Sequence, residues 1–213
     1  MIDAHTTRAA LLGGRLRGQA LLDRIRSVPP DTREAWTDSV LGLPEAPPDE
    51  SLPRGAVPYL PAAIDDVLAA LAGVPVGPTD VFVDIGSGLG RVVLLAHLLT
   101  GAKGVGIEIQ KGLVQAARHV ASELGLADVS FRRADAAELE LEGTVFFLYS
   151  PLTGEPLRRV LISLRNLAER QRIVICTVGL SLHHESWLSP RADLAPGVGC
   201  YDAGPPAQSL LTS

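Results

Sequence analysis

Apolar runs of strand length alternate with segments of helical periodicity through the middle and end of the chain. Such alternation with short connections is typical of a parallel sheet covered by helices, and the density of apolar residues fits strands buried on both faces. We therefore expect an α/β fold with a doubly wound sheet. Strands are expected at residues 81–84, 104–108, 129–132, 144–149 and 172–178, and helices between them at residues 90–100, 111–124, 136–139 and 155–168.

The chain before residue 81 follows a different pattern. An apolar stripe predicts one helix over residues 6–27, and further helices are expected at residues 32–41 and 62–72. Prolines at positions 44, 47, 48, 53, 58 and 61 predict an extended connector or lid between the last two helices. We therefore expect an N-terminal helical extension and proline-rich connector over residues 1–50, and the α/β domain over residues 51–213.

The run VFVDIGSGLGRVV, from Val81 to Val93, carries the most specific chemical signal. It joins a strand to an acid and then to three alternate glycines that precede a helix. Glycines let the backbone take positive φ and approach a ligand closely, and a helix start offers unpaired N–H groups. The run predicts a loop that binds a nucleotide-type cofactor. Its candidate binding residues are Asp84, Gly86, Ser87, Gly88 and Gly90.

The spacing of the glycines favours S-adenosylmethionine over a dinucleotide. The dinucleotide fingerprint is G-x-G-x-x-G, whereas this chain has G-x-G-x-G and carries Arg91 where the third glycine should fall. An acid before the first glycine suits a ligand that carries an ammonium and a sulfonium. The run D-I-G-S-G-L-G resembles the first motif of the class I S-adenosylmethionine-dependent methyltransferases. The resemblance implies a Rossmann-like methyltransferase sheet, with the glycine loop against the methionine moiety and Asp84 at its amino end.

Two further acids stand where a ribose and an adenine need polar partners. The second expected strand ends in Glu108, followed by Ile109, and a carboxylate there can accept hydrogen bonds from both ribose hydroxyls. Asp135, followed by Ala136, ends the third strand, and in the resembled family an Asp there accepts a hydrogen bond from the adenine amino group. The alternative is structural, because an acid after a strand is often the N-cap of the next helix.

The candidate catalytic residues are Tyr149, Ser150 and Pro151, at the end of the fourth expected strand. In an open α/β sheet, ligands lie beyond the carboxyl ends of the strands. Many methyltransferases that act on nitrogen carry an Asn- or Asp-Pro-Pro-aromatic motif at this place. Ser150 cannot reproduce the carboxamide or carboxylate of that motif, which argues against an amine acceptor. Tyr149 is the best candidate for a polar group near the axis of methyl transfer.

A narrower resemblance relates residues 81–93, 104–109 and 146–176 to the non-SET histone-lysine methyltransferases and their small bacterial relatives. In those relatives the strand end often reads aromatic-Asn-Pro-Phe, so the run from Tyr149 to Leu152 is a variant of it. A Tyr-x-Pro also precedes their glycine motif, as Tyr59 does in PYLP, which implies that Tyr59 reaches over the cofactor. Packing of the connector onto the core is the alternative role for this tyrosine.

Composition narrows the partners. The 213 residues carry a net charge of −5 at pH 7, which gives no general attraction to nucleic acid or to histone-bearing particles. We expect a protein side chain or a small molecule as the acceptor. No run is long and apolar enough to span a membrane and no signal-peptide pattern occurs, so a cytoplasmic location with reduced Cys176 and Cys200 is expected. His183 and His184 do not complete a metal site, and none is predicted.

Three alternatives remain open. The resembled fold has a sixth and a seventh strand, for which residues 198–201 and 209–212 are weak candidates. This edge is therefore expected to be short or missing, and either open to a large substrate or covered by a second subunit. The altered motif after Tyr149 also fits a catalytically inactive, cofactor-binding regulatory or scaffold protein. A nicotinamide-dependent oxidoreductase would need the missing third glycine.

Overall fold

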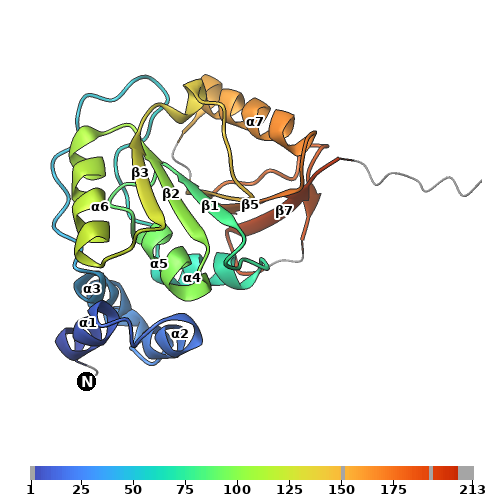
Figure 1. Cartoon of the computed structure of the whole chain (residues 1–213). Helices are drawn as coiled ribbons and strands as arrows, with labels where there is room; N and C mark the ends of the chain where they lie inside the picture. Colours follow the sequence, from blue (N-terminus) through green and yellow to red (C-terminus); the bar gives the residue numbers. More distant parts are fainter. Residues whose placement is uncertain (1–2, 150–151, 192–193, 206–213) are drawn as a thin grey trace, which may run out of the picture.

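The alternating runs form one mixed sheet in the computed structural model, which describes residues 3–149, 152–191 and 194–205 (Figure 1). The strands lie in the order β3-β2-β1-β4-β5-β7-β6, and β7 runs antiparallel to both of its neighbours. The five parallel strands are the predicted ones, each with one boundary moved by a single residue. They are β1 (Val81–Ile85), β2 (Lys103–Glu108), β3 (Val129–Arg133), β4 (Val145–Tyr149) and β5 (Ile173–Val178).

Helices cover both faces of the sheet, as the buried strands require. They are α4 (Ile64–Ala72), α5 (Arg91–Thr100), α6 (Lys111–Glu123), α7 (Gly154–Ala168) and the single 3₁₀ turn η1 (Ala136–Glu138). Successive side chains of a strand point to opposite faces, so Phe82 enters the core shared with α4, α5 and α6, whereas Val83 enters the core beneath α7. No helix in the described part of the chain is long and apolar enough to cross a membrane.

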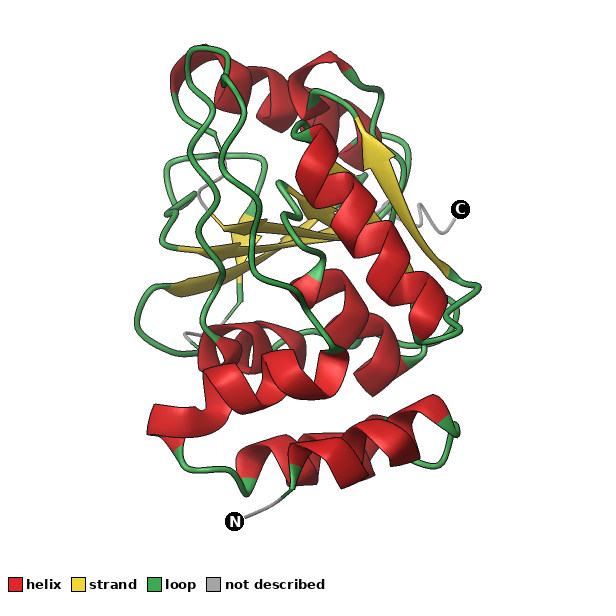
Figure 2. Cartoon of the chain, turned by 90° about the vertical axis from the view of Figure 1, so that its left-hand side faces the viewer, coloured by secondary structure: helices red, strands yellow, loops and turns green. Residues whose placement is uncertain are grey.

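The prediction of one helix over residues 6–27 is wrong, because glycines divide the segment. α1 (Ala4–Leu12) ends at Gly13, and α2 (Gly18–Arg26) begins after a loop in which Gly14 has a φ of +69°. α3 (Pro30–Leu41) follows and begins with a proline, which is favourable at the first helical position. Figure 2 shows these N-terminal helices gathered at one end of the molecule. The division into an extension and a domain at residue 50 stays a prediction.

Within the described residues, the C-terminal edge of the sheet has one full strand and one short strand. β7 (Val198–Ala203) includes the predicted residues 198–201 and pairs with β5 over its whole length, whereas β6 (Ser189–Pro190) has two residues. The other candidate, residues 209–212, lies outside the described residues. Cys176 and Cys200 are free and buried in directly opposed positions of β5 and β7, with their sulfur atoms 3.2 Å apart. Cys176 fills the core, as the sequence predicts.

A buried arginine joins the N-terminal helices to the glycine loop. Arg91 is the first residue of α5 and is 6% exposed. Its guanidinium donates to Glu34 at 2.7 Å, to Asp38 and to the carbonyl oxygen of Ala62 at 3.0 Å. Glu34 also accepts a hydrogen bond at 2.6 Å from the backbone N–H of Ile64, at the start of α4. One cation therefore fixes α3 and the start of α4 against the helix that follows the glycine loop.

We expect Arg91→Met to lower the free energy of unfolding by about 1–3 kcal/mol, because the carboxylates of Glu34 and Asp38 lose their charged donor. Arg170→Met is the matched control, since Arg170 and its partner Glu140 are more than half exposed, and it should change the free energy by less than about 1 kcal/mol. Urea denaturation followed by circular dichroism measures both. Equal effects of the two substitutions would contradict the role given to Arg91.

Candidate functional site

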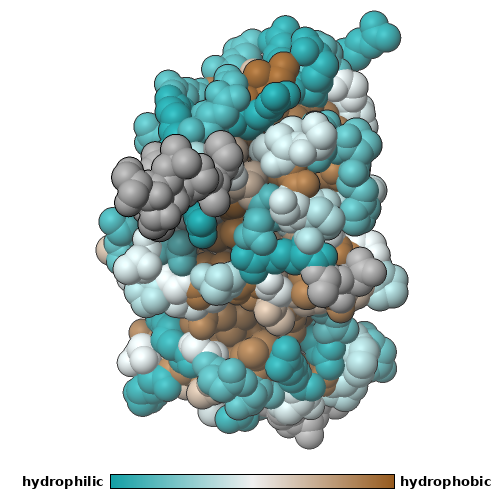
Figure 3. Space-filling model, turned by 90° about the vertical axis from the view of Figure 1, so that its right-hand side faces the viewer, coloured by the Kyte–Doolittle hydropathy of each residue, from teal (hydrophilic) through white to brown (hydrophobic). Residues whose placement is uncertain are grey.

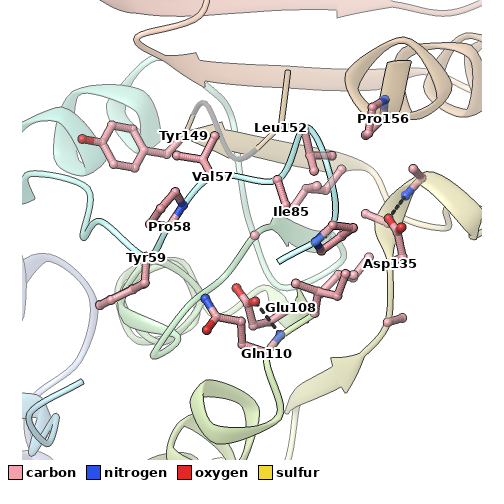
Figure 4. Close-up of a pocket in the computed structure, with 18 of the residues that line it drawn as sticks. Val57, Pro58, Tyr59, Ile85, Glu108, Gln110, Asp135, Tyr149, Leu152 and Pro156 are labelled. Atoms are coloured by element: carbon pink, nitrogen blue, oxygen red, sulfur yellow. Dashed lines mark hydrogen bonds between the residues drawn. The ribbon is translucent and has the colours of Figure 1, made fainter. Parts of the chain in front are cut away.

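A cavity of about 500 Å³ lies over the carboxyl ends of the first four strands (Figure 4). Its wall includes Ile85 and Gly86 from the end of β1, Glu108 from β2 and Asp135 after β3. Residues 53–60 of the proline-rich segment provide the opposite wall, which is mostly apolar. This is the edge at which open α/β sheets bind ligands.

Glu108 and Asp84 form a buried acidic pair at the end of the cavity beside the glycine loop. Glu108 is 7% exposed, and its carboxylate accepts hydrogen bonds from the backbone N–H of Gly88 at 3.0 Å and of Gln110 at 2.9 Å. Asp84 is 2% exposed, and its carboxylate has no hydrogen-bond donor among the described residues. Burial raises the pKa of Asp84 well above its usual range, and repulsion by Glu108 raises it further. The pair therefore favours a bound cation.

The three glycines of the loop have different roles. Gly86, with a φ of +81°, lines the cavity. Gly88 lies beneath the ring of Tyr59, where a Cβ atom would stand 2.1 Å from Tyr59 Cε2. A Cβ atom on Gly90 would stand 2.4 Å from Phe131, so this glycine permits the packing of α5 against β3. Of the three, Gly86 is the glycine that the cavity wall includes.

Asp135 both caps a turn and lines the cavity. Its Oδ1 atom accepts a hydrogen bond at 2.9 Å from the backbone N–H of Ala137, which makes it the N-cap of η1. The N-cap role that the sequence analysis gave as the alternative for Asp135 is therefore observed. The side chain lies on the cavity wall together with Ile109 and Ala136, and Figure 4 shows it across the cavity from Tyr59. The two roles are compatible, since a carboxylate has several acceptor sites.

The proline-rich segment closes the cavity and is attached at both ends. On the β2 side, the Asp49 carboxylate accepts hydrogen bonds from Gln110 Nε2 at 2.8 Å and from the backbone N–H of Tyr59 at 3.1 Å. On the β4 side, Ala56 forms a β-bridge with Leu152, and the N–H of Thr153 donates to the Gly55 carbonyl at 2.8 Å. The segment from Asp49 to Leu60 is called the strap below. The predicted lid is thus a fixed wall of the cavity.

The remaining predicted residues divide by position. Tyr149 lies at the end of β4 and lines the cavity, with Val57 of the strap beside it (Figure 4). Ser150 and Pro151 lie outside the described residues, so their role stays a prediction. No group of three or more metal-ligating side chains occurs in the described part of the chain. Of the predicted cofactor residues, the wall includes Tyr59, Gly86, Glu108, Ile109, Asp135 and Ala136, and it does not include Asp84, Ser87, Gly88 and Gly90.

Sequence reasoning missed several residues that shape the cavity. Gln110 fixes the strap to β2, and Pro156 joins the cavity wall, to which Leu152 of the predicted run also belongs. Gly179, after β5, lines the cavity and also a second one beside it. Gln110 directly follows the Glu108-Ile109 pair, which was a usable signal. The contacts of the strap had no such signal, because they join segments about sixty to one hundred residues apart.

Known proteins share this architecture. The family described as "Methyltransferase domain" matches residues 78–186. An RNA methyltransferase from Salinibacter ruber, solved with S-adenosyl-L-homocysteine, is 33% identical with a TM-score of 0.56, over 69% of this chain and 95% of that one. A putative methyltransferase from Escherichia coli shares the fold at 18% identity and a TM-score of 0.52, over 66% of this chain and 84% of that one. A SAM-dependent methyltransferase from Aquifex aeolicus also shares the fold. It is 14% identical with a TM-score of 0.51, over 65% of this chain and 88% of that one. No curated protein matches the chain.

We expect Asp84→Asn to raise the free energy of unfolding near pH 7, because the amide removes a buried charge without a donor. Folding raises the pKa of Asp84, so the protonated carboxyl group stabilises the folded protein. This contribution is fully present below the ordinary pKa of 3.8 and is lost as the pH rises through the pKa of the folded state. The advantage of the variant should therefore grow from pH 4 upward. Urea denaturation across this range measures it, with exposed Asp128→Asn as the control. A gain in the free energy of unfolding that does not depend on pH, or a variant less stable than the wild type, would contradict a buried Asp84 with a raised pKa.

Proposed function

Because the chain belongs to the class I S-adenosylmethionine-dependent methyltransferases, we propose that the cavity roofed by the strap holds S-adenosylmethionine and presents its methyl group beside Tyr149. The enzyme transfers a methyl group from this cofactor. The residues proposed to hold the cofactor are Tyr59, Asp84, Gly86, Ser87, Gly88, Gly90, Glu108, Ile109, Asp135 and Ala136.

The observation that carries the proposal is the buried carboxylate of Asp84, which has no donor within the described residues. A buried charge without a partner is costly, and a ligand ammonium would compensate it. S-adenosylmethionine carries an ammonium at its amino acid end. The Ser87 hydroxyl is also buried without a hydrogen-bond partner in the described part of the chain, on the same loop. A buried carboxylate and a buried hydroxyl without a hydrogen-bond partner, both close to Gly86 of the cavity wall in the chain, fit a polar end of a ligand.

The rest of the cavity suits a nucleoside. Each Glu108 oxygen accepts one backbone hydrogen bond and keeps further acceptor capacity for the ribose hydroxyls. Ile109, Ala136 and Leu152 give apolar surface for a flat base near Asp135. The Tyr59 ring lies over Gly88, so both roles considered for this tyrosine have support: it fixes the strap, and it covers the loop. These contacts let one ligand satisfy acids at the ends of three strands.

Placement is the main chemical task of the chain. The bound cofactor supplies a methyl group that is already electrophilic because of its sulfonium. Tyr149 and the strap residues Val57 and Pro58 line the end of the cavity next to β4, where they exclude water and orient an acceptor. Correct alignment of two reacting groups lowers the activation free energy by several kcal/mol, and alignment requires no metal or redox group from the protein.

We propose that the acceptor is a small molecule or a single side chain and not a nucleic acid. The strap and its contacts with Leu152 and Thr153 narrow the cavity, and the net charge of the chain is −5. RNA is the second candidate, because the Salinibacter ruber relative is an RNA methyltransferase. We also propose that, among class I methyltransferases, the chain is related to the small bacterial relatives of the non-SET histone-lysine enzymes. This proposal is supported by Tyr59 before the glycine motif and by the run from Tyr149 to Leu152, a variant of the motif in those relatives.

Titration calorimetry with S-adenosylhomocysteine tests the cofactor site. Asp84→Asn and Glu108→Gln should each weaken binding by about 1–3 kcal/mol, or roughly 5- to 150-fold in Kd, because each removes a charged partner. Glu140→Gln is the control, since Glu140 is an exposed acid that does not line the cavity. Unchanged affinity in both variants, with circular dichroism spectra like that of the wild type, would remove the proposed site.

Transfer from methyl-tritiated S-adenosylmethionine tests the acceptor class. The full chain is incubated in turn with a small-molecule extract, total protein and total RNA, and incorporated label is counted in each. We expect label in the small-molecule or the protein pool, because the roofed cavity admits a narrow group. Label confined to the RNA pool would overturn this choice and favour the second candidate.

A further inference from the structure

A second cavity, of about 760 Å³, lies beside the cofactor cavity and shares Gly179 with it. Gly179 follows β5, whose last residue, Val178, is paired in register with Tyr149 of β4. The shared residue therefore lies next to the end of the cofactor cavity at which transfer is proposed. The second cavity extends from there along the connection after β5 and the turn before β7.

Hydrogen bonds give this second cavity a defined shape. The N–H of Gly179 donates to the Gly197 carbonyl at 2.9 Å, which joins its two sides. The phenol oxygen of buried Tyr201 accepts a hydrogen bond at 3.0 Å from the backbone N–H of Leu182. The ring of His183 stands edge-on to that of Tyr201, with centroids 5.5 Å apart. A Cβ atom on Gly199 would stand 2.8 Å from both the Tyr201 hydroxyl and Thr177 Oγ1, so that position requires glycine.

The chemistry of the lining is apolar and uncharged. Leu180, Leu194, Ala195, Pro196 and Val198 supply most of the side chains. The polar side chains are those of Ser181, His183 and Tyr201, and no Asp, Glu, Lys or Arg lines the cavity within the described residues. Figure 3 shows apolar surface framed by polar residues on the side of the molecule that carries β7. Such a lining offers no Asp, Glu, Lys or Arg as a counter-charge to an anion or an ammonium.

We infer that the second cavity binds the body of the methyl acceptor, and that this acceptor is an uncharged, mainly apolar small molecule. The inference rests on the proposed function, because the shared Gly179 matters only if the methyl group is presented beside Tyr149. The lining of the second cavity comes from the connection after β5 and the segment that leads into β7 and includes no residue of the strap, so the acceptor has an approach of its own. Apolar lining with a few polar groups is the usual composition of small-molecule sites.

Saturation-transfer NMR on the full chain, with S-adenosylhomocysteine filling the first cavity, tests the inference. The probes are 2-naphthol, its anionic counterpart 2-naphthoate, and adenosine 5′-monophosphate. We expect binding of 2-naphthol, at least tenfold weaker binding of 2-naphthoate, and none of the nucleotide. Leu194→Arg and Ser181→Asp, which place charges in the lining, should each weaken 2-naphthol binding at least fivefold. Ile162→Arg, on the exposed face of α7, should leave it unchanged.

The outcomes separate this inference from the proposed function. Leu194 packs on Gly73, so Leu194→Arg risks misfolding, and the exposed Ser181 provides the safer variant. Normal binding of S-adenosylhomocysteine together with equal binding of 2-naphthol and 2-naphthoate, or with 2-naphthol binding unaffected by Ser181→Asp, would overturn the inference alone. Failure of the wild type to bind S-adenosylhomocysteine would overturn the proposed function and the inference with it.

Discussion

Two carboxylates buried at the ends of adjacent strands set the conditions for the rest of the site. The backbone at Gly88 and Gln110 supplies hydrogen bonds to Glu108, which holds the glycine loop and the start of α6 around one acid. Asp84 receives no such support in the described part of the chain. Folding thus satisfies one member of the pair and leaves the other in need of a cation, which lowers stability and favours a ligand that brings one.

Segments from before the sheet complete what the carboxylates begin. The strap is tied to Gln110 on the cofactor side and to the β4–α7 connection on the other, so one segment borders both ends of the cavity. Arg91 holds α3 and the start of α4 near the same loop, through charged partners supplied by Glu34 and Asp38. The loop that carries the family motif is therefore held in place from two sides.

Local patterns predicted most of the fold but only part of the site. Apolar runs located the five parallel strands within one residue, because strands buried on both faces leave a continuous signal. Over residues 6–27 the apolar stripe predicted one helix, although Gly13 and Gly14 interrupt the segment and separate α1 from α2. Asp84 and Glu108 could be found because each is an acid near the end of an apolar strand. The strap contacts could not, since Asp49 and Gln110 meet only through the folded chain.

The family match begins at residue 78, yet the strap and the carboxylates that pair with Arg91 come from earlier in the chain. The matched region thus lacks one wall of the cavity and both carboxylate partners of Arg91. A fragment that started there would keep the strands and the glycine motif, but it would expose a cation selected for a buried position and leave the cofactor cavity without one wall. Sequence similarity to the family marks the strands and the glycine motif, while one wall of the cavity is built by residues that precede the match.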